Sequence, residues 1–138
     1  MNKDDVKYIV VHCSYTPEQM DIGAADIDRW HREKGWMMIG YHKVIRRDGT
    51  IEDGRPVTRP GAHTRNWNRT SIGVCYAGGV DEKGQPEDNR TEAQRESLVR
   101  LINTLLEEFP EVNDIAGHNE FSNKACPCFN VKRWWNEC

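Results

Sequence analysis

Residues 7–12 of the chain have the sequence KYIVVH. After Lys7 and Tyr8 the residues before His12 are all apolar and are Val or Ile, which is typical of a strand buried inside a sheet. We therefore predict a central strand over residues 7–11 that ends at His12. A second apolar run over residues 72–77 predicts another buried strand, which the pair Gly78-Gly79 ends.

Two substantial helices are expected around these strands. Thr91 and Gln94 form a capping-box pattern, and apolar side chains follow at helical intervals until Pro110, which predicts a helix over residues 91–108. A first helix near residues 22–34 is predicted from its apolar spacing, with Asp21 as the cap and Gly35 at the end. Asn130 can cap a final turn or two.

A hairpin and a short strand complete the pattern. Asp48-Gly49 lies between two β-rich pairs, and this dipeptide supplies the positive φ angles of tight hairpin turns. Tyr41 and His42 open the hairpin. Residues 112–116 form a strand candidate that leads into His118. These elements predict an α/β fold, with residues 1–138 forming a single domain and a central mixed β-sheet flanked by helices.

Composition excludes several classes of protein. A chain of 138 residues with 37% hydrophobic residues fits one globular domain. The longest apolar runs are far shorter than the roughly 20 residues of a membrane span. Two acids near the N-terminus, with no apolar region after them, are atypical of a signal peptide, so we expect synthesis in the cytoplasm. A net charge of -3 argues against nucleic acid as a partner.

The charge is unevenly distributed along the chain. Basic side chains outnumber acids over residues 41–70, and acids outnumber basic side chains over residues 81–120. One interpretation is two differently solvated faces. The other is a basic cleft that attracts an anionic ligand, in which arginines from residues 46–69 meet carboxylates.

The odd number of cysteines, five, disfavours a secreted framework held together by disulfide bonds. Cys126 and Cys128 form a C-x-C pattern that is awkward for a mutual disulfide. Cys13 and Cys75 lie in or beside apolar runs, so we interpret them as small buried hydrophobic residues.

Two histidines follow predicted strands, and ligand sites in α/β sheets gather at the carboxyl ends of strands. His12, His118 and Cys126 could supply the three nitrogen and sulfur ligands of a catalytic zinc site, which keeps a fourth position open. No compact metal-binding motif is present. The alternative is that each histidine is a hydrogen-bonded surface or core residue.

A series of ordered motifs covers nearly the whole chain. They are Val11-His12-Cys13-Ser14, Gly40-Tyr41-His42, Arg47-Asp48-Gly49-Thr50, Gly61-Ala62-His63, Asn68-x-x-Ser71-Ile72-Gly73-Val74, Gly117-His118 and Lys124-Ala125-Cys126-Pro127. Through them the chain resembles the phage-lysozyme type of N-acetylmuramoyl-L-alanine amidase, a relative of the animal peptidoglycan recognition proteins.

The resemblance implies a fold, a cofactor and a set of site residues. It implies one zinc ion per chain, bound by His12, His118 and Cys126, with Tyr41 and Lys124 as the catalytic pair. It also implies that His63 contacts the substrate in the cleft. Cys128 stands where relatives commonly have Ser, and such a neighbour could bind metal wrongly or oxidise.

The reaction implied is hydrolysis of the amide between N-acetylmuramic acid and L-alanine in peptidoglycan. We expect water to attack the lactyl carbonyl, with the metal and the Lys124 ammonium stabilising the developing oxyanion. Tyr41 would position the water and exchange a proton. His42, which should face away from Tyr41, and His31 are interpreted as structural.

Two other functions remain open on the residues alone. One is a module that binds peptidoglycan without cutting it, and the other is hydrolysis by a Cys–His nucleophile pair. For the enzyme we expect a peptidoglycan or muropeptide substrate, a monomer, and action on the cell wall after release from the cytoplasm, as in an endolysin.

Overall fold

The computed structural model describes residues 1–138 and is built around a five-stranded sheet. Its strand order is β4-β3-β5-β1-β7, so the first long strand of the chain lies inside the sheet. Strands β3, β5, β1 and β7 pair in parallel, and β4 pairs antiparallel with β3. The predicted mixed sheet is therefore confirmed. The strands are β1 (Tyr8–Cys13), β3 (Lys43–Ile45), β4 (Ile51–Asp53), β5 (Ser71–Tyr76) and β7 (Asp114–Gly117).

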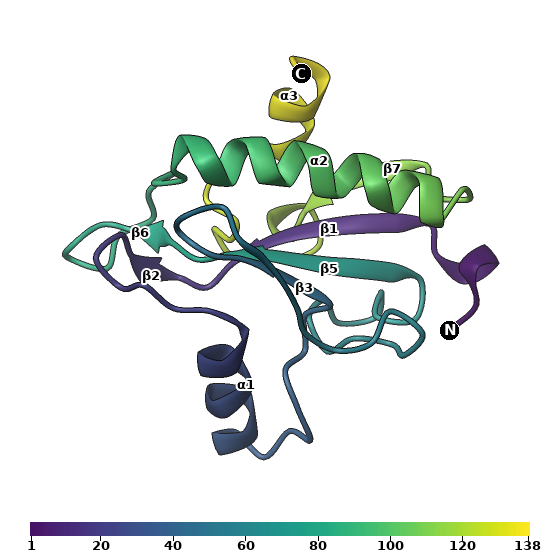
Figure 1. Cartoon of the computed structure of the whole chain (residues 1–138), viewed down its shortest axis with the longest axis horizontal. Helices are drawn as coiled ribbons and strands as arrows, with labels where there is room; N and C mark the ends of the chain where they lie inside the picture. The colour runs from purple at the N-terminus through teal and green to yellow at the C-terminus, as the bar shows by residue number, and fades with distance from the viewer.

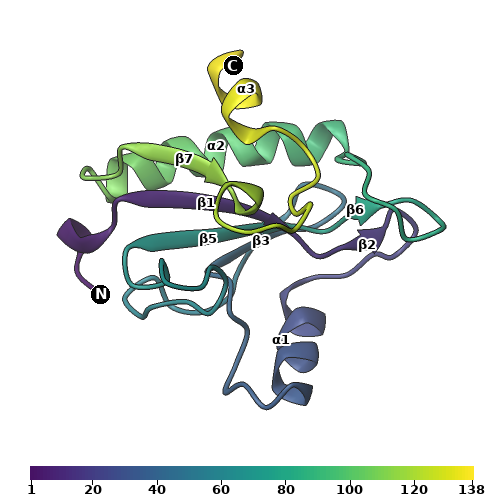
Figure 2. The same ribbon diagram turned by 180° about the vertical axis from the view of Figure 1, so that it is seen from behind.

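Helices lie on both sides of this sheet. Figure 1 shows α2 (Glu92–Glu108) running along one face, while α1 (Ala24–Glu33) extends from the opposite side. The last helix, α3 (Val131–Asn136), follows the loop after β7, as the reverse view in Figure 2 shows. The short elements are η1 (Lys3–Asp5), η2 (His118–Glu120) and a separate pair of parallel strands, β2 (Thr16–Pro17) and β6 (Gly79–Val80).

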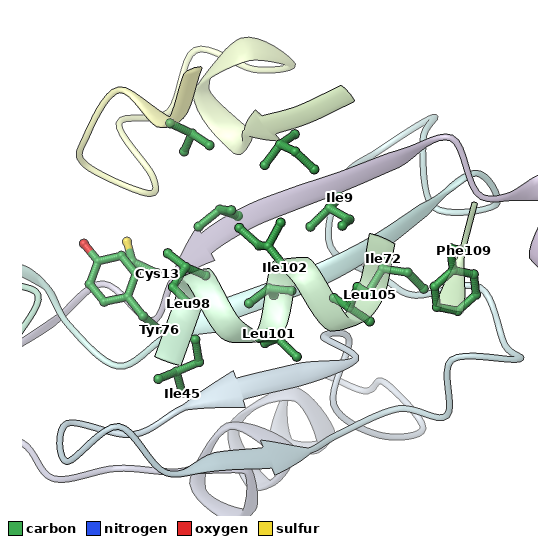
Figure 3. Packing of buried hydrophobic residues seen from close by; sticks show 14 of the residues in the cluster. Ile9, Cys13, Ile45, Ile72, Tyr76, Leu98, Leu101, Ile102, Leu105 and Phe109 are labelled. Carbon is green, nitrogen blue, oxygen red and sulfur yellow. The ribbon is translucent and has the colours of Figure 1, made fainter. Parts of the chain in front are cut away.

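The main hydrophobic core fills the space between α2 and the sheet. Side chains of successive strand residues point to opposite faces, so alternate residues of β1 and β5 meet the apolar stripe of the helix. Figure 3 shows Ile9 and Ile72 facing Ile102 and Leu105 in this layer. A smaller cluster that includes Ile27 and Cys75 lies beneath α1. Both Cys13 and Cys75 are buried, as predicted.

The α2 start is as predicted. Thr91 accepts a hydrogen bond from the Gln94 amide, and the Gln94 side chain accepts one from the Thr91 amide. The side-chain NH₂ of Gln94 also donates to the Ala77 carbonyl, which fixes the helix to the sheet.

The predicted start of α1 is wrong. The helix begins at Ala24, after Gly23, and the Ala24 amide donates to a Glu52 carboxylate oxygen at 2.8 Å. Asp21 instead lies 3.4 Å from the Arg46 guanidinium. A carboxylate distant in sequence therefore satisfies the amide that a local cap would have bonded.

Other boundaries differ by a few residues. Strand β1 continues one residue past His12, and β7 is shifted toward His118 relative to the prediction. In the hairpin only Gly49 has a positive φ, and the Asp48 carboxylate accepts a hydrogen bond from the Thr50 amide. No helix is both long enough and apolar enough to span a membrane.

Candidate metal centre and active-site cleft

Two histidines meet because β1 and β7 are parallel neighbours. Val11 is in register with Gly117, so His12 and His118 both lie at the carboxyl ends of the paired strands. Their ring centroids are 4.6 Å apart. The sheet therefore brings together residues that are more than 100 positions apart in sequence.

The third member of the group comes from the loop between η2 and α3. The Cys13 amide donates to the Cys126 sulfur at 3.3 Å, and that sulfur lies 3.8 Å from Nδ1 of His12. The Tyr76 hydroxyl donates to the Pro127 carbonyl at 2.7 Å, which holds the loop against the sheet. The ligand atoms of His12, His118 and Cys126 all lie within 4.8 Å of one another, so the predicted group is brought together.

The local environment favours the protonation states that bind a metal. Burial lowers the pKa of His12, which keeps its imidazole neutral near pH 7. Hydrogen bonding by the Cys13 thiol, together with that of His118 and His12, outweighs burial and lowers the pKa of the Cys126 thiol. Neutral imidazole and thiolate are the forms that coordinate metal ions.

The second ring nitrogen of His12, Nε2, contacts hydrogen-bonding side chains on the side away from Cys126. This nitrogen lies 2.9 Å from Nδ1 of His63 and 3.2 Å from the hydroxyl of Thr64. His63 in turn contacts the Ser71 hydroxyl through Nε2 at 3.3 Å. The amides of residues 63 and 64 both donate to the Asn68 side chain, which fixes this turn.

A cleft of about 570 Å³ opens beside this group, and two of its three members, His118 and Cys126, line it, together with residues of α1 and of the loop 124–126. Two of the predicted site residues, Tyr41 and Lys124, line it together with His118 and Cys126. The complete lining is Cys13, Ser14, Tyr15, Ile27, Trp30, His31, Lys34, Tyr41, His118, Lys124, Ala125 and Cys126.

Tyr41 and His42 point in different directions, as expected for consecutive residues of an extended chain. The Tyr41 ring lies 5.0 Å from the His12 ring, and burial raises the pKa of its phenol. His42 is fully buried, where its Nδ1 accepts a hydrogen bond from the Gly73 amide and its Nε2 lies 2.8 Å from the Arg59 carbonyl. His31 accepts a hydrogen bond from the Gly40 amide, yet it also lines the cleft.

Some of the sequence-predicted contacts are not in the cleft. His63 does not line it but lies behind His12, and no arginine from residues 46–69 lines it either. Arg47 and Arg55 donate to backbone carbonyls elsewhere. The cations at the cleft are Lys34 and Lys124.

Sequence reasoning missed three contributors to the site. Thr64 is buried beside His12 although no sequence pattern indicates it, and the Cys13 amide supports Cys126 although the sequence indicates only a core role for Cys13. The part of α1 that lines the cleft, including Trp30, was also missed. The side chains of α1 reach the cleft because of where the helix packs in the folded protein, and the local sequence does not indicate this.

The profile of one protein family, described as N-acetylmuramoyl-L-alanine amidase, matches residues 2–129. The chain belongs to this family. The amidase is 44% identical over 135 residues to an endolysin of Escherichia phage T7, a match that covers 98% of this chain and 89% of the phage protein. An endolysin of Klebsiella phage KP32 matches with the same identity and coverage.

Solved structures of similar fold agree with this assignment. The N-acetylmuramoyl-L-alanine amidase LysC from Clostridium intestinale URNW superposes with a TM-score of 0.83 at 28% identity, covering 98% of this chain and 86% of that one. Drosophila PGRP-LB, at 24% identity, covers 88% of this chain and 74% of that one with a TM-score of 0.72, and it shares the fold. The protein is thus an amidase of peptidoglycan with a lytic function, as its motifs implied.

Proposed function

We propose that this amidase depends on one zinc ion per chain, bound by His12, His118 and Cys126, when it hydrolyses the bond between N-acetylmuramic acid and L-alanine. The observation that carries the proposal is the convergence of two imidazoles and one thiol, with ligand atoms within 4.8 Å, beside the cleft. Three nitrogen and sulfur ligands beside open space are typical of catalytic zinc.

The chemistry of these donors fits the ion. Zinc bound there would polarise the amide carbonyl and lower the pKa of water. Nδ1 of His12 faces Cys126, while Nε2 is occupied by His63 and Thr64, so the ring has one nitrogen free for a ligand bond. A hydrogen-bonded second nitrogen is the usual support of a metal-binding histidine.

Lys124 is proposed to stabilise negative charge on the reacting carbonyl. It is an exposed residue of the cleft wall, two positions before Cys126, so its ammonium can approach a substrate carbonyl beside the ligand group. A fixed positive charge near the developing oxyanion lowers the barrier to acyl transfer.

Tyr41 is proposed to orient the attacking water and to exchange a proton with it. Its ring lies beside that of His12 at the cleft, and its raised pKa keeps the phenol protonated near pH 7. A neutral phenol can donate one hydrogen bond and accept others, which suits a residue that holds water against a carbonyl.

A substrate contact by His63 stays a prediction. The ring is bonded to His12 and to Ser71, so the contacts in this structure support a role behind the ligand.

We further propose that residues 1–138 act as one amidase domain and as a monomer. The name endolysin, carried by the phage relatives, supports action on the cell wall after release from the cytoplasm in which the protein is made. Peptidoglycan or a muropeptide is the substrate. One solved relative, a single-residue mutant of Drosophila PGRP-LB, is described in complex with tracheal cytotoxin.

The test is release of L-alanine amino termini from purified peptidoglycan, before and after chelation and after addition of zinc. We expect release to stop with chelator, to return with zinc and to be absent in His118→Ala, while Asn119→Ala, a change at the exposed neighbouring residue, remains active. Release that persists without metal would favour a Cys–His nucleophile. Tight binding without any release would favour a recognition module.

A further inference from the structure

Three of the five cysteines gather at the carboxyl end of β1. Cys126 contacts the Cys13 amide through its sulfur, and the sulfurs of Cys13 and Cys128 lie 3.9 Å apart. The other two are elsewhere: the Cys75 thiol donates to the Tyr76 carbonyl, and the Cys138 thiol donates to the Trp134 carbonyl. The grouping therefore singles out one close pair beside the ligand Cys126.

The two sulfurs are close enough to bond after a small adjustment. A disulfide bond is about 2.05 Å long, so the sulfurs, now 3.9 Å apart, must approach by about 1.9 Å. The backbone around Cys128 is held in place, because its amide donates to the Ala125 carbonyl and the preceding Pro127 carbonyl accepts from Tyr76. The close approach thus belongs to a fixed part of the fold.

Which thiols can react depends on their exposure and on whether they belong to the proposed metal ligand set. Cys128 is half-buried and so accessible to a small oxidant, whereas Cys13 is 3% exposed and lies at the cleft. Cys126 belongs to the proposed metal ligand set, which leaves Cys13 as the partner that Cys128 can reach.

We propose that Cys13 and Cys128 form a reversible disulfide bond that joins the end of β1 to the loop carrying Lys124 and Cys126, while Cys126 stays available to the metal. A small-molecule disulfide such as oxidised glutathione is the oxidant. The Cys128 sulfur attacks one glutathione sulfur and the other leaves as a thiol; the Cys13 sulfur then attacks Cys128 and expels the second. The protein loses two protons and two electrons, which reduce the glutathione disulfide to two thiols.

The bond would restrict the unfolded chain. The two residues are 115 positions apart, and a cross-link over so long a loop removes much of the conformational freedom of the unfolded state. The oxidised protein should therefore have a higher thermal midpoint than the reduced protein. It should also keep the proposed metal site, since the ligand thiol is not consumed.

The experiment treats the zinc-loaded protein with oxidised glutathione, blocks free thiols with iodoacetamide and maps the peptides without reduction. We expect two fewer alkylated cysteines, a Cys13–Cys128 peptide, a raised thermal midpoint and reversal of all three by dithiothreitol. Cys138→Ser should behave like the parent protein, and Cys128→Ser should show neither the bond nor the shift.

Three results would overturn the proposal: five alkylated cysteines after oxidation, a bond that includes Cys126, or glutathione that remains attached to Cys128. Because Cys13 is buried, Cys13→Ser is used only as a second variant, and Cys128→Ser carries the test if that protein does not fold.

Discussion

At the scale of single residues, His12 is the side chain on which the site depends most. One of its nitrogens faces the Cys126 sulfur, and the other is occupied by His63 and Thr64. The ring therefore cannot rotate without losing contacts on both sides. Such support by a second group fixes the tautomer and raises the affinity of the ligand for metal.

His63→Ala should weaken zinc binding about 10- to 100-fold, since loss of the partner behind a ligand histidine has effects of this size. The measurement is competition for zinc against a chelator of known affinity. Arg65→Ala, a change at an exposed residue two positions away, is the matched control and should leave the affinity unchanged. An unaltered zinc affinity in His63→Ala would show that the contact does not support the metal.

Tyr41→Phe should lower the rate of amide hydrolysis by about 10²- to 10⁴-fold, the range expected when a proton-transferring group is removed. The ring remains, so its packing beside His12 and the zinc content should not change. The check is to measure the turnover number and the bound zinc on the same preparation. Full activity with normal zinc content would remove Tyr41 from the catalytic role.

At the scale of elements, the contact between the start of β3 and the middle of β5 has a pH-sensitive residue at its centre. His42 is fully buried and bonded to Gly73 and to the Arg59 carbonyl, and burial lowers its pKa to about 4. In the unfolded chain the pKa of histidine is near 6.5, so between these values the unfolded state binds more protons. The stabilisation from this group is complete above pH 6.5 and is lost as the pH falls toward 4.

The free energy of unfolding should accordingly fall with pH over this window, with about 3 kcal/mol of the change due to His42. Urea denaturation at a series of pH values measures it, and His42→Gln should show a shallower slope whatever its stability at neutral pH. Equal slopes in the two proteins would mean that His42 does not remain neutral in the folded state.

The elements also show how far the fold could be predicted. Local patterns were sufficient for α2, where the Thr91 cap and the apolar spacing agree, and for the buried strands. They failed at the start of α1, because the carboxylate that bonds Ala24 comes from Glu52 in β4. A cap supplied from another element leaves no trace in the local sequence.

At the scale of the whole molecule, the proposed metal would join three parts of the chain that are otherwise linked by packing and hydrogen bonds. Its ligands come from β1, from η2 and from the loop before α3. Removal of zinc should therefore lower the thermal midpoint as well as activity. At a free zinc concentration about 1,000-fold above Kd the stabilisation is about 4 kcal/mol.

Calorimetry with and without chelator measures this effect. Cys126→Ser is the informative variant, because it removes one ligand atom and should reduce the difference between the two conditions. If chelator leaves the midpoint of the parent protein unchanged, the three residues do not hold a metal that contributes to the fold.

The residues alone made His12, His118 and Cys126 one possible ligand set, and the family resemblance was needed to choose it over separate structural roles. Spacing along the chain does not indicate that His12 and His118 become neighbours, since this follows from the parallel pairing of β1 with β7. The motifs likewise implied that Tyr41 and Lys124 lie at the cleft, and both residues line it in the structure. His63 had the same support, yet it lies behind the ligand, because a motif identifies a residue and not the direction of its side chain.

The central position of β1 in the sheet has a consequence for how the protein is made. On the ribosome, β1 is among the first segments to emerge, but its neighbour β7 follows about a hundred residues later, and Cys126 later still. Contacts of such long sequence separation form slowly and need both segments to be present. A partly synthesised chain therefore lacks the proposed ligand set, and a lytic activity that depends on the proposed zinc ion would arise only after nearly all of the polypeptide has been translated.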